Sequence, residues 1–311
     1  MKDNGLLVQY FNANTPADQT LWAKAVKDAA TLKKLGATAV WFPPATKGAA
    51  GKDDRGYAPY DLYDLGEFNQ KGSVGTRYGT KKEYLEAIDA MKAQGINVYA
   101  DIAVRQKLGA DSVEKVTAAD FNAKDIPQMI GNKKIVGALS KFTFPGRKSK
   151  YSKFKWNWNH FAGIDWQQDD FKRRVCELSG MTEMEAEKKY KLSKYDYIIG
   201  SELDLYNQEV YDELMAWAKW YEDVTGVDGF RFQEAEKIPG WFIRDFAEAA
   251  SNAGEEEKEI FTVGDFWHWR CDYINDYIAS ADNQPSMFDV PLHFNFYNAS
   301  HGGGGYDMRN I

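Results

Sequence analysis

Four polar residues of the chain lie at or near the ends of short apolar runs. In parallel sheets the ends of the strands commonly carry catalytic and binding side chains. Asp101, Arg231 and Gln233 lie within or directly after such runs, and Asp265 directly follows another. A carboxylate there can act as an acid, a base or a nucleophile, whereas the neutral amide of Gln233 cannot form a covalent intermediate. Side chains alternate along a strand, so Arg231 and Gln233 are expected to share one face and Glu234 to point away.

The elements that must position these residues are short β-rich runs that alternate with amphipathic stretches. We expect six strands, at residues 6–11, 38–42, 97–102, 229–232, 260–264 and 287–290. Helices are expected between them, at about residues 20–35, 82–94, 207–224, 239–251 and 271–281. Apolar runs of this length separated by helices are typical of parallel βα units that are buried on both faces.

This alternation breaks after the third strand. Residues 104–204 are polar and aromatic, and a stretch that long inside a βα series indicates an inserted subdomain instead of a loop. The pattern predicts an α/β fold of the (β/α)8 TIM-barrel type, truncated after the sixth strand. The expected parts are 1–103 as the first part of the barrel, 104–205 as the insertion, and 206–311 as the incomplete second part. Open barrel edges would favour self-association.

Composition limits the classes of partner. The 311 residues are 44% hydrophobic and 15% aromatic, which is enough for a large core, and the net charge is −7 without a basic stripe. Nucleic acid is therefore not expected as a partner, and no apolar run is long enough to span a membrane. No apolar signal segment follows Met1, which predicts a cytoplasmic protein or the mature form of a secreted one. Cys176 and Cys271 do not make a disulfide framework, although one bridge is possible.

Many segments resemble the bacterial liquefying-type α-amylases of glycoside hydrolase family 13. The matching residues are 5–11, 38–44, 60–68, 71–72, 78–81, 144–147, 154–156, 288–293 and 303–309. The resemblance implies a barrel with a B-type insertion after the third strand, and retaining hydrolysis of α-1,4-glucans such as starch and maltooligosaccharides. A retaining glycosidase uses one carboxylate as the nucleophile and a second one as the acid and base.

The resemblance also implies a role for each position, and several of them are altered. Gln233 stands at the position of the nucleophilic Asp, and Asp265 replaces the acid/base Glu with a side chain one C–C bond shorter. Asp101 and Arg231 match the family, and a buried structural ion pair is favoured over a catalytic role for them. The His-Asp motif near the seventh strand has no counterpart before Ile311.

Further positions concern substrate and metal. The resemblance makes Tyr60, Gln106, Lys237 and His268 candidates for substrate binding, together with Asp101 and Arg231, although Tyr60 is also compatible with barrel packing. It implies calcium as a possible cofactor. The ligand set is altered, because Arg105 stands where the family has an Asn ligand and has no acceptor to offer. Glu202 and Asp204 remain as weak calcium candidates, in an acidic segment that begins at 195–197.

Three functions are compatible with these residues. The first is an α-amylase-type hydrolase whose catalysis is impaired at Gln233. The second is an inactive protein that still binds α-glucan, through natural or engineered loss of the nucleophile. The third is a new activity in the old pocket, lined by Arg105, Gln106, Gln233, Asp265 and His268, with His268 as the general base.

Overall fold

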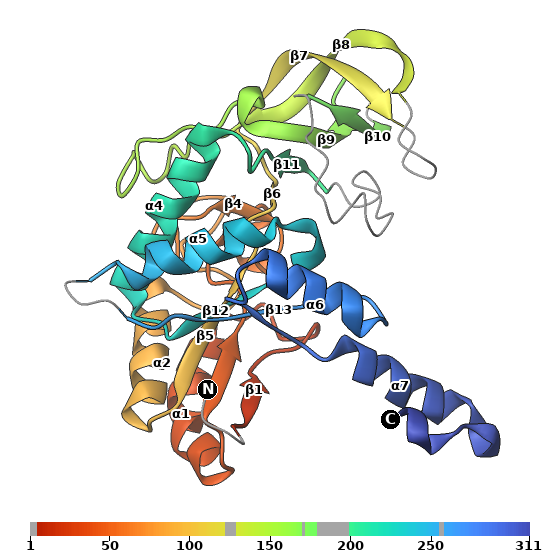
Figure 1. The fold of residues 1–311 in the computed structure, drawn as a ribbon. Coiled ribbons are helices and arrows are strands. Elements are labelled where there is room, and N and C mark those ends of the chain that lie inside the picture. Colours follow the sequence, from red (N-terminus) through yellow and green to blue (C-terminus); the bar gives the residue numbers. More distant parts are fainter. Residues whose placement is uncertain (1–4, 122–128, 170–171, 179–198, 255–257) are drawn as a thin grey trace.

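The computed structural model describes residues 5–121, 129–169, 172–178, 199–254 and 258–311. Its central sheet consists of six parallel strands that follow one another in chain order (Figure 1). They are β1 (Leu7–Gln9), β2 (Ala39–Phe42), β5 (Asn97–Ile102), β12 (Gly229–Phe232), β13 (Phe261–Gly264) and β14 (Ser286–Met287). Within the described residues, β1 and β14 each pair with one neighbour and not with each other, so the sheet is open there.

Helices connect these strands, close to the positions that the sequence predicts. They are α1 (Leu21–Lys34), α2 (Lys81–Ala93), α4 (Gln208–Thr225), α5 (Gly240–Ser251) and α6 (Cys271–Ser280). Local sequence explains their ends. Thr80 and Glu83 form a reciprocal capping box at the start of α2, and Asn207 caps α4. The helix α4 ends at Gly226, which adopts the left-handed conformation at φ 62° that a glycine tolerates best.

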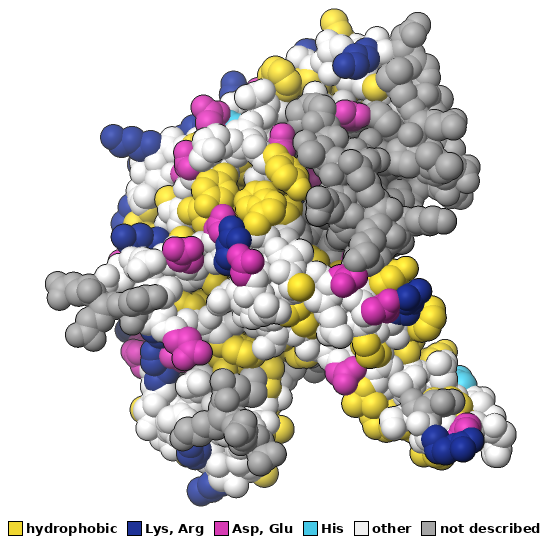
Figure 2. Space-filling model, in the orientation of Figure 1, with side chains coloured by type: hydrophobic (Ala, Val, Ile, Leu, Met, Phe, Trp, Pro, Cys, Tyr) yellow, Lys and Arg dark blue, Asp and Glu magenta, His cyan; other side chains and the backbone are white. Residues whose placement is uncertain are grey.

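The last predicted strand is wrong in part. The strand β14 ends at Met287, and the helix α7 (Val290–His301) begins where the prediction continued the strand. Asp289 caps this helix by accepting a hydrogen bond from the Leu292 amide at 3.0 Å, and Pro291 fits the first helical turn because it needs no amide donor there. The helix α7 projects from the rest of the chain (Figure 1), and apolar side chains lie along it in Figure 2.

The segment after the third strand forms a second sheet, whose strands the sequence analysis did not identify. It is antiparallel, in the order β6 (Gln106–Lys107), β11 (Ser201–Leu203), β9 (Phe161–Gln167), β10 (Lys172–Glu177), β7 (Ser112–Phe121) and β8 (Met129–Lys141). Val116, Val136 and Ile164 belong to its small core. The sheet lies beyond the carboxyl end of β5, at the top of Figure 1.

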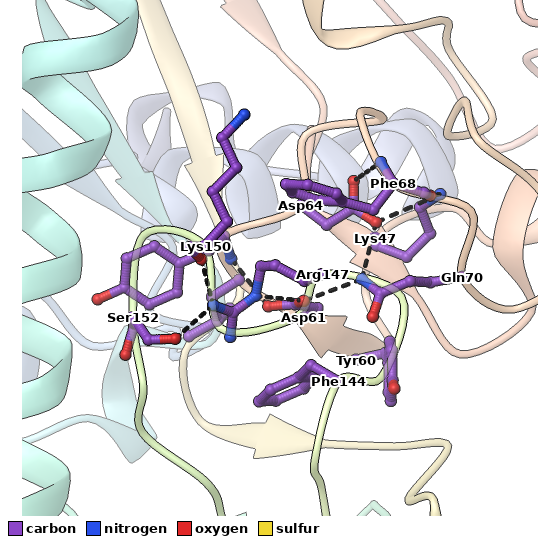
Figure 3. A network of polar contacts seen from close by, with 12 residues as sticks. Lys47, Tyr60, Asp61, Asp64, Phe68, Gln70, Phe144, Arg147, Lys150 and Ser152 are labelled. Atoms are coloured by element: carbon purple, nitrogen blue, oxygen red, sulfur yellow. Dashed lines mark hydrogen bonds and ion pairs between the residues drawn. The ribbon is translucent and has the colours of Figure 1, made fainter.

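A buried polar network fixes the long connection between β2 and α2 (Figure 3). The ammonium of Lys47 is fully buried, lies 3.5 Å from the Asp64 carboxylate, and donates to the carbonyls of Phe68, Ser73 and Val74 at 2.6–3.1 Å. Each donor of this ammonium therefore has an oxygen partner, which a buried cation requires.

The same network reaches the inserted segment. Gln70 donates to both Asp61 at 2.9 Å and Asp64 at 3.0 Å, and Asp61 accepts from Arg147 Nε at 2.8 Å. Arg147 belongs to a loop after β8 and donates further to the carbonyl of Ser152 at 2.7 Å. The parallel sheet and the insertion are thus joined through side chains as well as through the chain itself (Figure 3).

The structure also bears on the two cysteines and on membrane-spanning helices. Cys176 is buried and Cys271 is exposed, and the possible disulfide between them is not formed. Over the part of the chain that the structure describes, no helix is both long enough and apolar enough to cross a membrane.

Candidate active site

The strand ends bring the sequence-predicted residues together. β12 lies between β5 and β13, and the register pairs Arg231 with Asp101 on one side and Phe232 with Gly264 on the other. Gln233 and Asp265 are the first residues beyond these neighbouring strands. In barrels of βα units the carboxyl ends of the strands carry the chemistry.

Arg231 is the centre of this group. Its NH1 lies 3.1 Å from both oxygens of Asp101, and its NH2 lies 2.7 Å from Oδ2 of Asp265. The side chains are 8%, 0% and 10% exposed, respectively, and the guanidinium carbon sits 4.6 Å from the centre of the Trp41 ring. A planar guanidinium is well suited to hold two carboxylates and an aromatic face at once. We call Arg231, Asp101 and Asp265 the strand-end cluster.

Two aromatic residues that the sequence analysis missed complete the surroundings of Asp101. Tyr57 donates its hydroxyl to Oδ2 of Asp101 at 2.7 Å, and the Trp41 indole donates to the same oxygen at 3.1 Å. Burial, followed by the negative charge of Asp101, raises the pKa of Tyr57, so the phenol stays a donor. Trp41 lies in a predicted strand, but no local pattern marks its indole or the Tyr57 hydroxyl as a partner of Asp101.

Asp265 has both carboxylate oxygens engaged. Its Oδ1 accepts from the Glu234 amide at 2.8 Å, while Oδ2 accepts from the Trp267 indole at 3.1 Å in addition to Arg231. The backbone holds the residue as well, because its carbonyl accepts from the Ala235 amide at 2.9 Å. A general acid must present a protonated oxygen to the substrate. Here each oxygen is directed at a protein donor.

Gln233 is half-buried, and its amide makes no hydrogen bond to another residue of the described chain. At the ends of β12 and β13 the only carboxylate in the positions directly after the strands is therefore that of Asp265. Retaining glycosidases place two carboxyl groups roughly 5 Å apart. These two strand ends provide one carboxyl group and one amide.

Glu234 departs from the expected alternation. It adopts a left-handed conformation at φ 50° and ψ 52°, which turns the chain from β12 into a short 3-10 helix at Ala235–Lys237. Its side chain accepts from Arg105 NH2 at 3.0 Å and from Lys237 Nζ at 2.6 Å. Both oxygens of Glu234 therefore have cationic partners.

Glu236 is a second carboxyl group near these strand ends. It is buried, and its Oε2 has no hydrogen-bond partner among the described residues. Burial raises the pKa of Glu236 to about 7, and the nearby charge of Asp265 adds to this rise. That oxygen is closed off from solvent.

The remaining substrate candidates lie in different surroundings. Gln106 is buried in β6 and donates to the Tyr57 carbonyl at 3.1 Å, which places it near the strand-end cluster. Tyr60 is buried beside the polar network of Figure 3. Its hydroxyl donates to Asp111 at 2.7 Å, and its ring contacts Phe144.

His268 lies apart from Asp265. Its ring stacks on Tyr273 with a centroid distance of 4.3 Å, and its Nδ1 accepts from the Arg270 amide at 3.1 Å. Burial, followed by the positive charge of Arg270, lowers the pKa of His268. In the described chain no hydrogen bond joins His268 to Asp265, so the pair that a general base would need is not formed here.

The residues at the expected calcium position do not fit a calcium ion. Both oxygens of Glu202 accept from Arg105 NH1 at 3.2 Å, and the Asp204 carboxylate accepts from the Tyr206 amide at 3.1 Å. The described residues contain no group of three or more acidic, His or Cys side chains that could hold a metal. Calcium prefers 6–8 oxygen ligands, and a guanidinium offers none. The acidic residue of the segment 195–197, Asp196, lies outside the described residues.

Comparison with known proteins gives close relatives. No family model matches the chain. The chain is 43% identical to an α-amylase of Geobacillus stearothermophilus. The 310 matched residues cover 99% of this chain and 56% of that relative. The chain is also 41% identical over 310 residues to a glucan 1,4-alpha-maltohexaosidase of Bacillus sp. (strain 707), covering 99% of this chain and 59% of that protein. The chain thus spans somewhat more than half the length of these relatives.

Solved structures agree on the fold. The α-amylase of Geobacillus thermoleovorans, solved in complex with acarbose, superposes with a TM-score of 0.53 at 15% identity, over 98% of this chain and 58% of that one. This likeness confirms the predicted α/β fold of the TIM-barrel type, of which the chain covers a part.

Proposed function

From its place among the α-amylases, we infer that this chain is an α-1,4-glucan-binding protein on an α-amylase scaffold, in which retaining hydrolysis is impaired. Starch and maltooligosaccharides are the proposed ligands. The observation that carries the proposal is the pair of residues after β12 and β13, where Gln233 stands at the nucleophile position beside an Asp265 whose oxygens are already engaged.

Impaired hydrolysis follows from the chemistry of these two side chains. An amide cannot attack the anomeric carbon and leave as a carboxylate, and removing a catalytic nucleophile commonly costs on the order of 10⁴-fold in rate. Asp265 is one bond shorter than the family's Glu, and a displacement of about 1 Å can cost roughly 100-fold. Its contact with Arg231 at 2.7 Å further directs it away from proton transfer to a leaving group.

Glucan binding is supported by an aromatic surface beside the same strand ends. Trp267 is 54% exposed, while its indole nitrogen is anchored on Asp265 at 3.1 Å, so the ring is held in place and open to solvent. Sugars present apolar C–H faces that stack on such rings. Trp269 is also exposed and offers a second ring on which a sugar can stack.

Glucan binding can be measured separately from cleavage. Isothermal titration with maltohexaose is expected to show binding that Trp267→Ala weakens about 10-fold, through the loss of one stacking platform. Lys82→Gln, at an exposed position on α2, is the control and leaves the affinity unchanged. The absence of any binding by the unmodified chain would refute the proposal.

The origin of the impairment is tested by restoring both carboxylates. The double variant Gln233→Asp/Asp265→Glu is expected to release product from an end-labelled maltooligosaccharide faster than the unmodified chain. Gln233→Asn, which stays neutral, is the matched control. Equal cleavage by the unmodified chain and by the double variant would mean that another group performs the chemistry.

A further inference from the structure

A second set of charges lies where the insertion joins the parallel sheet. Arg105 contacts Glu202 at 3.2 Å and Glu234 at 3.0 Å, and Lys237 contacts Glu234 at 2.6 Å. We call these four residues the junction cluster. Their side chains are 5%, 13%, 28% and 12% exposed in the order Arg105, Glu202, Glu234 and Lys237.

The four residues come from three separate segments. Arg105 lies between β5 and β6, where the chain leaves the parallel sheet, and its carbonyl accepts from the Leu203 amide at 2.7 Å. Glu202 lies in β11, where the chain is about to return from the insertion, and it pairs with Gln106 of β6. Glu234 and Lys237 lie in the connection between β12 and α5. The cluster therefore links both ends of the insertion to the neighbouring strand of the parallel sheet.

Among these four residues the charges balance when both glutamates are ionised; burial raises the pKa of Glu202 to about 7, so this balance is complete above that pH. Arg105 and Lys237 contribute two positive charges, and Glu202 and Glu234 contribute two negative charges. One divalent cation would bring the same two positive charges to the same carboxylates. With the guanidinium and the ammonium already in place, a calcium ion would meet like charges at close range and would find the carboxylate oxygens directed at nitrogen donors.

We propose that Arg105 and Lys237 replace calcium as the cations that hold the inserted sheet on the parallel sheet, which makes this junction independent of metal. The disagreement between the calcium implied by the resemblance and the residues present is thereby explained. The cations at this junction are side chains, which cannot dissociate. The inference concerns the junction and does not depend on whether the chain cleaves glucans.

The first test needs no variant. Thermal unfolding of the unmodified chain is measured in excess EDTA and in excess calcium. We expect midpoints that agree within about 1 °C, because no site binds the ion in the folded state alone. A calcium site filled to about 100 times its Kd would raise the midpoint by roughly 5 °C, and such a rise, lost again in EDTA, would overturn the proposal.

The second test removes one cation. Arg105→Gln keeps a polar hydrogen-bonding side chain, although a shorter one, and removes positive charge beside Glu202 and Glu234, so the midpoint in EDTA is expected to fall by roughly 5 °C. Amide hydrogen exchange should become faster in β6 and β11 and stay unchanged in α1. Lys82→Gln, which removes an exposed cation that lies 3.7 Å from Glu86, is the control and should change neither.

The third test asks whether the two kinds of cation exchange. Arg105→Asn should allow terbium, a calcium analogue, to bind near the freed carboxylates, with tryptophan-sensitised luminescence that the unmodified chain does not show. Glu234→Gln, which keeps the cations and removes one acceptor, serves if the Asn variant does not fold, and it should lower the midpoint equally in EDTA and in calcium. Terbium luminescence from the unmodified chain at the same concentration would contradict the proposal.

Discussion

Two buried arginines at the ends of neighbouring strands each hold two carboxylates, and they do so for different purposes. Arg231 joins Asp101 to Asp265, and all three lie in or directly after strands of the parallel sheet. Arg105 joins Glu202 of the inserted sheet to Glu234 of the connection that follows β12. The first cluster fixes the positions of the candidate active site, whereas the second fixes one sheet against the other.

The surroundings of the two arginines differ as well. Asp101 is fully buried and has indole and phenol donors besides its guanidinium, while Glu234 is 28% exposed and shares its charge between two cations. A buried charge that loses its partner is costly because nothing replaces the lost solvation, and a partly exposed charge can turn to water. The two clusters should therefore respond to the same kind of mutation by different amounts.

The largest expected effect is at Arg231. Arg231→Leu leaves Asp101 and Asp265 without their cation in a buried site, and should lower the free energy of unfolding by about 3–5 kcal/mol. Urea unfolding measures the change. Arg231→Lys keeps the charge but not the two-sided contact, so it should lie between the Leu variant and the unmodified chain. A loss below about 1 kcal/mol for the Leu variant would show that Asp101 is not held in the way described.

Arg105→Gln should lower the same free energy by about 2 kcal/mol, because its carboxylates keep partial access to water and to Lys237. Its effect on hydrogen exchange should be confined to the insertion, whereas that of Arg231→Leu should spread over β5, β12 and β13. If the two variants have equal effects in size and location, the distinction between the clusters fails.

At Lys107, two residues after Arg105, removal of the charge is expected to raise the free energy of unfolding, whereas at the two arginines it is expected to lower it. Its ammonium has no hydrogen-bond partner in the described chain and lies 5.1–5.4 Å from the ring centres of Trp156, Phe142 and Phe144. Burial lowers the pKa of Lys107 to about 7. The nearby charges are those of Asp61, Asp111 and Glu213, which oppose this shift, and of Arg147, which adds to it.

Lys107→Met should therefore stabilise the chain by about 1–2 kcal/mol at pH 6. The folded pKa lies below the usual value near 10.4, so the cost of burying the charge is complete below pH 7 and declines as the pH rises toward 10. The difference in unfolding free energy between the variant and the unmodified chain should shrink over that interval. A difference that is constant with pH would mean that Lys107 is not charged differently in the two states.

The smallest effect on stability is expected at Trp267. Because most of its ring is exposed, Trp267→Ala should change the unfolding free energy by less than about 1 kcal/mol while it weakens maltohexaose binding. Trp22→Ala, at a fully buried ring of the core, is the contrasting variant and should cost about 3–5 kcal/mol. A Trp267 variant that unfolds as readily as the Trp22 variant would assign the ring to packing instead of to ligand.

The sequence predicts the parallel sheet well because its strands carry a strong local signal. Ala39–Phe42, Asn97–Ile102 and Gly229–Phe232 are apolar, buried runs bounded by turns, and their register brings Asp101 and Arg231 together. The start of α7 was not predicted because Met287 to Val290 form a β-rich run. In the structure, the Asp289 cap and Pro291 favour a helix there.

The inserted sheet and the junction cluster were harder to predict for a physical reason. Among its described side chains, the strand Ser112–Phe121 buries only Val116, Ala118 and Ala119. This short apolar set beside charged residues gives a weak strand pattern. Arg105, Glu202 and Glu234 are up to 129 residues apart, and no local pattern pairs them. The sequence predicted that calcium ligands were altered at Arg105, but only the fold places Glu234 and Lys237 beside it.

We propose that this chain binds α-glucan and that its hydrolysis of the bound glucan is impaired. The most direct measurement is one long incubation with end-labelled maltohexaose, in which bound ligand is measured at the start and products are separated at the end. The account predicts saturable binding and no product above a heat-inactivated control. Product formation well above that control, lost in an Asp265→Asn variant, would contradict it and would make Asp265 a working catalytic group.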